Sequence, residues 1–339
     1  MQEKKWTEEL DYIEPDYDLK KLLANLSKKE LAEIGKKWGC QGMSQLNKFE
    51  LIEELMSKIT DNLESWILLL GSEQVIYLQG IIFFSDYYSR ISMELDEWVH
   101  HAVEYFQPRG IVFPGRYKGN TIFLVPKKIR AKIKTILKKE NVQKQINLND
   151  KYIKYAAGSA VYYGVLTPDL LYDSLEQYMK LEGEIAPLKV ILEYGYYSPI
   201  FFCDGPLFIF NMVEDYNDIL VKRGELTDLN YYIPSEKEIE NANKKYHEYW
   251  NLAQLRLKKM LTKEYRLAKE DAEKLICYFS LMIKNDSNTA EIIKVFTDEF
   301  EINILEEEIN FNQLVNDFRN NTRLWKLKGH TPAEIIALS

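Results

Sequence analysis

Lysine side chains are the residues of this sequence whose types and spacing most clearly suggest a chemistry. An N-terminal stretch, residues 19–58, carries 8 Lys against 5 Glu, a local charge of +3. Clustered cations of this kind are typical of a surface that binds a phosphate backbone. Lysine-rich helix faces that are only solvated are also common, so that interpretation stays open. The candidate phosphate-binding residues of this stretch are Lys28, Lys29, Lys36, Lys37 and Lys48.

Other groups of basic residues interrupt an otherwise acidic chain. The formal net charge at pH 7 is -8, which argues against non-specific nucleic-acid binding over the whole surface. Residues 127–145 nevertheless carry a local charge of +7, and residues 256–269 one of +5. Arg116 and Lys118 stand beside Gly119 at the expected tip of a β-hairpin, and they are further candidates for contacting phosphate. We therefore expect basic patches on an acidic body.

The residue types most often used in catalysis are few and scattered. The histidines are His100, His101, His247 and His330, and the cysteines are Cys40, Cys203 and Cys277. No histidine has the spacing of a zinc site, and no cysteine has a histidine close by in the sequence to act as its base. The G-x-S-x-G motif of serine hydrolases does not occur. The sequence therefore predicts a protein that is not an enzyme and uses no metal and no cofactor.

The composition does not point to secretion or to a membrane. The 3 cysteines are odd in number and far apart, which does not suggest a disulfide framework. No apolar run approaches the length that spans a bilayer. The first residues, MQEKKWTEELDY, lack the charged-then-apolar order of a signal peptide. We therefore expect a cytoplasmic protein without a membrane partner.

The N-terminal cations are positioned by two short helices whose starts are visible in the sequence. Ser27 and Asn47 each precede a glutamate by three residues, which is the spacing of a capping box. Two glycines between the helices supply a flexible loop, and the leucines form a small core. Residues 19–59 are therefore predicted to be a compact helix–loop–helix module, loosely tethered to the rest, that follows an extended arm over residues 1–18.

This module resembles the N-terminal domain of transcription termination factor Rho, a small fold related to SAP domains. The matching positions are Leu22, Leu26, Glu30, Leu31, Ile34, Gly39, Gly42, Ser44, Leu46, Lys48, Glu50, Leu51 and Ile52. In those families the module accompanies RNA or DNA binding, so the resemblance implies the same role here. It does not imply the ATPase of Rho, because the phosphate-loop motif GxxxxGK[ST] does not occur in the chain. A purely protein-binding use of the module stays open.

Two central blocks, residues 60–145 and 146–234, repeat one order of expected elements. Each predicts three helices followed by a β-hairpin, with the hairpins near residues 111–125 and 197–211. That order is typical of a winged helix-turn-helix, in which the third helix reads a groove and the hairpin contacts the backbone. The second hairpin, YYSPIFFCDGPLFIF, has almost no charge, which favours the alternative that such hairpins only cover a core.

Residues 235–339 predict an all-helical C-terminal domain. Ser235 has the spacing of another capping box and starts one long helical pattern, which runs to about residue 261. The closing segment, FRNNTRLWKLKGHTPAEI, resembles the end of uncharacterised bacterial proteins related to SEC-C-motif proteins, although the zinc motif itself is absent. We expect Trp325 to dock onto this domain. An alternative phosphate-binding edge consists of Arg319, Arg323, Lys326, Lys328 and His330.

These patterns predict a mostly α-helical protein with a small N-terminal module, two winged-helix-like blocks and a helical C-terminal domain. The favoured function is a cytoplasmic nucleic-acid-binding protein, regulatory and transcription-related, whose partner is DNA or RNA. The alternative is a non-catalytic scaffold that binds a protein partner or a second copy of itself. Its 23 Tyr, several of them in pairs, are the residue type that favours such interfaces.

Overall fold

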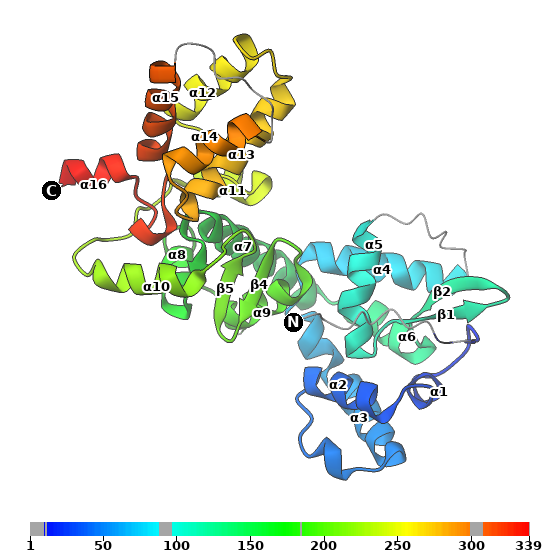
Figure 1. The fold of residues 1–339 in the computed structure, drawn as a ribbon. Helices are drawn as coiled ribbons and strands as arrows, with labels where there is room; N and C mark the ends of the chain where they lie inside the picture. Colours follow the sequence, from blue (N-terminus) through cyan, green and yellow to red (C-terminus); the bar gives the residue numbers. More distant parts are fainter. Residues whose placement is uncertain (1–9, 11, 88–96, 184, 299–307, 339) are drawn as a thin grey trace. The chain divides into compact units, whose positions relative to one another are not determined.

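The structure is a computed structural model that describes residue 10 and residues 12–87, 97–183, 185–298 and 308–338 (Figure 1). The fold is mostly helical with two small antiparallel sheets, as the sequence predicts. Within these ranges no helix is both long enough and apolar enough to cross a membrane. The chain forms two compact units: residues 1–151 with 183–199 are unit 1, and residues 152–182 with 200–339 are unit 2.

Unit 1 is built from helices around a single two-stranded hairpin. Its elements are α1 (Leu19–Ala24), α2 (Lys28–Lys37), η1 (Met43–Gln45), α3 (Lys48–Ile67), α4 (Ser72–Tyr87), α5 (Glu97–Phe106), η2 (Gln107–Arg109), β1 (Phe113–Tyr117), β2 (Asn120–Leu124), α6 (Lys127–Ile136) and α9 (Pro187–Tyr197). The helix α7 (Glu140–Tyr163) begins in this unit and continues into the other. The predicted capping boxes at Ser27 and Asn47 are confirmed, with both reciprocal hydrogen bonds formed at each.

The expected boundary after residue 59 falls inside α3, which runs on to Ile67. Leu55, Ile59 and Leu63 continue one apolar stripe at four-residue spacing, and all three are buried. Nothing in that stretch stops a helix, so the stripe carries α3 past the expected boundary. The buried side chains of α1, α2 and α3 belong to the same hydrophobic core as those of α4, α5 and α6. The N-terminal module is therefore an integral part of unit 1 and not a loosely tethered domain.

The N-terminal arm adds an extended segment to the edge of β1. β1 and β2 pair in antiparallel register, which confirms the first predicted hairpin. Leu10 bridges to Gly115 in parallel, with its backbone N–H donating to the Pro114 carbonyl at 3.0 Å. Ile13 is completely buried against Gly115, where an added Cβ would lie only 2.8 Å from the Ile13 side chain. Glycine is therefore required at this point of the hairpin.

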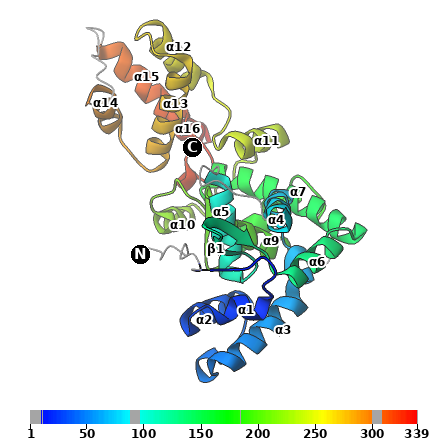
Figure 2. The ribbon, with the colours of Figure 1, turned by 90° about the vertical axis from the view of Figure 1, so that its right-hand side faces the viewer.

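Unit 2 combines a three-stranded sheet with a group of helices, α12 to α15, that lie together in both views (Figures 1 and 2). The sheet order is β3-β5-β4, with both pairs antiparallel. β4 and β5 confirm the second predicted hairpin. The elements are β3 (Val165–Leu166), α8 (Pro168–Glu176), β4 (Phe201–Asp204), β5 (Leu207–Phe210), α10 (Tyr216–Glu225), α11 (Glu236–Lys245), α12 (Leu252–Lys263), α13 (Lys269–Lys284), α14 (Thr289–Asp298), α15 (Glu308–Asn321), η3 (Trp325–Leu327) and α16 (Pro332–Leu338).

The prediction of one long helix after Ser235 is wrong, because a loop separates α11 from α12. Tyr246 has a left-handed backbone conformation, with φ of 58°, and ends α11. Asn251 then forms a new capping box with Gln254 and starts α12. The helical periodicity continues across both segments, so the break was not visible from periodicity alone. It produces a short loop, residues 246–251, that becomes important below.

Trp325 anchors the C-terminal segment of unit 2, but its ring packs chiefly against Gly164 and Phe210 and not against the helical domain of residues 235–339, where we expected it to dock. Its side chain is completely buried, and its indole Nε1–H donates to the Val161 carbonyl at 3.0 Å. Arg223 donates to the Trp325 carbonyl at 2.8 Å and to the Val165 carbonyl at 2.9 Å. Gly164 has a φ of +75°, and a Cβ there would lie 2.8 Å from the indole. The end of the chain is thus held against α7 and β3 by a buried ring and a buried guanidinium.

Two helical glycines provide a matched test of packing. Gly158 on α7 would place a Cβ 2.6 Å from the backbone oxygen of Ile239 on α11, whereas Gly80 on α4 has nothing within 4 Å. We expect Gly158→Ala to lower the free energy of unfolding by about 1–3 kcal/mol through overpacking. Gly80→Ala should raise it by about 0.5–1 kcal/mol, because alanine is the better helix former. Urea unfolding followed by circular dichroism measures both, and equal effects would contradict the α7–α11 contact.

Candidate nucleic-acid interface

The seven predicted cations are all exposed, and all lie in unit 1. They form two groups on different elements. One consists of four lysines on α2 and Lys48 at the start of α3, and the other of Arg116 and Lys118 on the β1–β2 hairpin. Figure 1 shows α2 and this hairpin in different parts of unit 1. The structure therefore does not join the predicted residues into one continuous patch.

Within the first group, three lysines also make contacts inside unit 1. The Lys28 ammonium donates to the Ser44 carbonyl at 3.3 Å, and the Lys48 ammonium donates to the Ala24 carbonyl at 2.7 Å. The Lys37 ammonium lies 4.7 Å from the centre of the Tyr196 ring on α9. These cations stay exposed, but each is partly engaged in holding the helix ends together.

Lys29 and Lys36 are the best placed pair of the group. They are exposed and seven residues apart on α2, a spacing that puts two side chains on one face of a helix, two turns apart. Glu33 lies between them on that face and is only partly exposed. A phosphate backbone that follows α2 would meet these two ammonium groups first.

The hairpin group is presented by a tight turn. Lys118 and Gly119 have φ values of 50° and 80°, the combination that a two-residue type I′ turn requires. Arg116 pairs with Thr121 across the hairpin, and its backbone also bonds to the arm at Leu10 and Ile13. The arm thus fixes the strand from which the Arg116 and Lys118 side chains extend.

Sequence reasoning missed a further pair of exposed cations at the start of α6. Lys127 and Lys128 are exposed, whereas Arg130 is buried and Lys132 donates to the Thr60 carbonyl on α3 at 2.5 Å. Lys139 pairs with Glu64 at 2.7 Å. The local charge of +7 pointed to a basic segment at residues 127–145. Only the packing of α6 on α1 and α3 shows which of its basic side chains are exposed and which contact the rest of unit 1.

The helices expected to read a groove pack against each other instead. α5 and α9 each precede a hairpin, and they are in contact within unit 1. Glu193 on α9 accepts hydrogen bonds on a single carboxylate oxygen from Trp66 Nε1 at 3.1 Å, from Arg109 at 2.6 Å and from the Tyr105 hydroxyl. A helix face that holds this network is not available to enter a groove.

The Tyr105 hydroxyl of the Glu193 network is kept protonated by its surroundings. The Arg109 side chain is only 6% exposed, and its guanidinium lies 3.8 Å from the Tyr105 ring centre. Burial raises the pKa of Tyr105 well above its usual range, and the Glu193 carboxylate raises it further despite the opposing Arg109 charge. The phenol therefore stays a donor at neutral pH. Trp38, the C-cap of α2, joins through its indole N–H, which donates to the Arg109 carbonyl at 2.8 Å.

The alternative edge at the C-terminus is used for internal contacts. Arg323 donates to the Gly329 carbonyl at 3.0 Å and pairs with Glu334 at 3.1 Å. Lys328 donates to the carbonyls of Leu226 and Leu229 at 2.6 and 2.8 Å. These bonds hold the final turn in place, so this edge is a weak candidate for phosphate.

Comparisons with known proteins add no family. No protein-family model matches the chain, and neither a curated protein nor a solved structure matches it. In the part of the chain that the structure describes, no three His, Cys, Asp or Glu side chains are close enough to hold a metal ion. The side chain of His100 lies outside the described residues.

Removing the Glu193 carboxylate tests the buried network. We expect Glu193→Ala to lower the free energy of unfolding by roughly 3 kcal/mol, because Arg109 would be left buried and unpaired. Glu193→Gln keeps an acceptor oxygen and should show a smaller loss. Glu140→Ala, which breaks an exposed pair with Lys144, is the control and should have almost no effect. A loss below 1 kcal/mol for Glu193→Ala, measured by urea unfolding, would contradict the network.

Proposed function

We propose that unit 1 binds nucleic acid through contacts to the phosphate backbone, with α2 as the main surface. The observation that carries this proposal is the exposure of all seven predicted cations in a chain whose net charge is -8. The acidic remainder repels a polyanion, so a few exposed cations decide where it docks. The resemblance of residues 19–59 to the Rho N-terminal domain supports the same role and makes RNA or DNA the partner class.

Exposed Phe49 supports a single-stranded partner. It stands next to Lys48, is 62% exposed, and has the Lys20 ammonium 4.9 Å from its ring centre. An exposed ring flanked by cations is the usual platform on which unpaired bases stack. The α2 surface would then contribute phosphate contacts, and Phe49 a contact that does not depend on sequence.

We also propose that residues 146–234 keep the element order of a winged helix. The order helix, short strand, two helices and hairpin supports this, with α7, β3, α8, α9, β4 and β5 in turn. The sheet order β3-β5-β4 places the short first strand beside the last, as a winged helix requires. This block is not the phosphate surface, because Glu193 occupies its third helix and its hairpin strands carry Asp204 but no lysine or arginine.

A non-catalytic interaction scaffold is the second candidate function. It is favoured by large apolar side chains that stay exposed around the loop between α11 and α12. Tyr249, Leu252 and Leu255 are 44%, 72% and 45% exposed. A surface of this kind binds another protein more readily than a polyanion.

Charge reversal on α2 tests the first proposal. The wild-type protein should bind oligonucleotides with a log–log salt slope of roughly -3 to -4, as three to five phosphate contacts predict. Lys29→Glu combined with Lys36→Glu should weaken binding to all sequences and reduce that slope by roughly 2. The control is Lys180→Glu combined with Lys222→Glu, which changes the charge equally on exposed residues of unit 2. Fluorescence anisotropy with single- and double-stranded probes measures both.

The hairpin is tested separately by Arg116→Glu. If the hairpin contacts the same strand as α2, this change should reduce the slope by about 1. If only α2 binds, the slope should stay at the wild-type value. No binding of wild-type protein to DNA or RNA at low salt, or equal effects of the α2 and control variants, would reject the proposal and favour the scaffold.

A further inference from the structure

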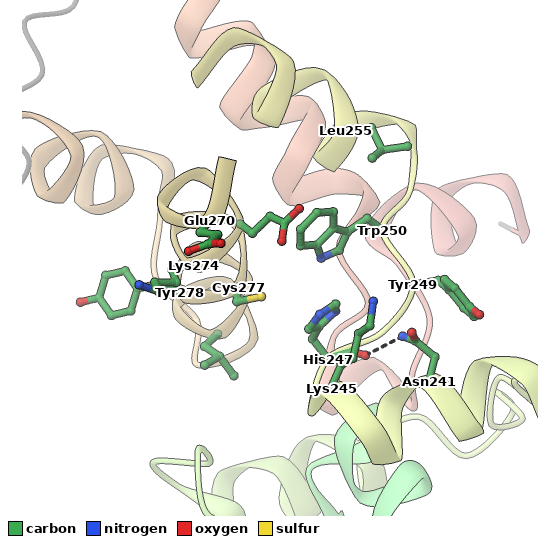
Figure 3. A pocket seen from close by; sticks show the side chains of 12 residues that line it. Asn241, Lys245, His247, Tyr249, Trp250, Leu255, Glu270, Lys274, Cys277 and Tyr278 are labelled. Atoms are coloured by element: carbon green, nitrogen blue, oxygen red, sulfur yellow. Dashed lines mark hydrogen bonds between the residues drawn. The ribbon is translucent and has the colours of Figure 1, made fainter. Parts of the chain in front are cut away.

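A cleft of about 800 Å³ lies in unit 2 between the loop of residues 246–251 and α13. One wall is a stacked pair of rings, His247 and Trp250, whose centres are 5.4 Å apart at an interplanar angle of 21°. The other wall is α13, from which Cys277 points toward the stacked pair, whereas Tyr278 points away from it (Figure 3). This volume lies within the range of small-molecule binding sites.

The loop that carries the aromatic wall is held in place from several sides. The Asn241 side chain donates to the His247 carbonyl at 3.2 Å (Figure 3). Asn251, the cap of α12, donates to the Asn321 carbonyl at 2.6 Å. The Lys258 ammonium lies 4.7 Å from the Trp250 ring centre and pairs with Glu273 on α13. The wall is therefore formed before any ligand arrives.

A smaller cavity of about 50 Å³ lies directly against the cleft, since four residues line both: Lys245, His247, Cys277 and Leu281. Glu248 and Lys284 also line this inner cavity. They form an ion pair at 3.2 Å, with side chains only 6% and 3% exposed. The inner cavity is the smaller of the two and extends the cleft toward the Glu248–Lys284 pair.

The Glu248 carboxylate is only half satisfied. Its Oε2 atom meets the Lys284 ammonium, but its buried Oε1 atom has no hydrogen-bond donor among the described residues. An unpaired buried acceptor is unfavourable by about 1–3 kcal/mol. A group that enters the inner cavity with an O–H or N–H would therefore supply Glu248 Oε1 with the donor that it lacks among the described residues.

We propose that this cleft binds a small aromatic molecule that carries one neutral O–H or N–H donor. The ring lies against the His247–Trp250 wall, and the donor reaches Glu248 Oε1 through the inner cavity. The donor is neutral because the Glu248–Lys284 pair already sums to zero charge, and a further buried charge would have no counter-ion. The proposal does not rest on nucleic-acid binding, whose residues lie in unit 1.

Cys277 lines this site and does not act as a nucleophile. Burial raises the pKa of its thiol to about 11, so the thiol is protonated at neutral pH and behaves as a small apolar side chain. Its position on both cavities makes it the point where a larger side chain would separate them.

The test uses the full-length protein and three related probes, measured by equilibrium dialysis. Indole carries one neutral N–H, 1-methylindole has lost it, and 3-methylindole keeps it while adding a methyl group elsewhere. We expect indole and 3-methylindole to bind with affinities within about threefold of each other. 1-Methylindole should bind at least about tenfold more weakly, because Glu248 Oε1 stays unpaired. Equal binding of indole and 1-methylindole, or no binding of any probe, would overturn the proposal.

Two protein variants place the binding in the cleft. Cys277→Phe should fill the passage between the two cavities and weaken indole binding more than tenfold, whereas Cys277→Ala should bind it like the wild-type protein. Leu281→Phe obstructs the same passage from a second position and replaces Cys277→Phe if that variant does not fold, as judged by thermal unfolding. Unchanged indole binding in a folded obstructed variant would also overturn the proposal.

Discussion

The hydrogen-bond network around the Glu193 carboxylate is the interaction on which unit 1 depends. One oxygen of this carboxylate accepts hydrogen bonds from Trp66 on α3, from Tyr105 on α5 and from Arg109 in η2. α9, which carries it, belongs to unit 1 although residues 152–182 intervene in the chain. A largely buried carboxylate, a buried guanidinium and two neutral donors depend on one another, because removing one leaves a charge or donor unpaired in the interior. The network therefore holds together segments that are distant in sequence.

This network also decides which surfaces of unit 1 stay available. It draws α5 and α9 together, so the helices that precede the two hairpins do not act as groove readers. Through Trp38 it reaches α2, whose opposite face carries Lys29 and Lys36. A support of this kind holds the exposed lysines of α2 at fixed positions, as the proposed phosphate contacts require.

The two proposed binding surfaces rest on different physics. The α2 surface uses exposed ammonium groups, so salt weakens it. The cleft in unit 2 uses burial and one unpaired acceptor, so salt should have little influence there. Its formation depends on the break at Tyr246, because a continuous helix through residues 246–251 would not fold the His247–Trp250 pair back toward α13.

Local patterns in the sequence determined the helix starts at Ser27, Asn47 and Ser235 and both hairpins, because caps and turns depend on residues only a few positions apart. They also determined which lysines are exposed on α2. Tertiary structure alone decided that the buried side chains of α3 share one core with those of α4, α5 and α6. It also decided that Glu193 is largely buried in a network, since its three donors lie 127, 88 and 84 residues away in the chain. No periodicity distinguishes that glutamate from its exposed neighbours, nor Glu248 from Glu240, because the difference lies in long-range partners that only the packed fold supplies.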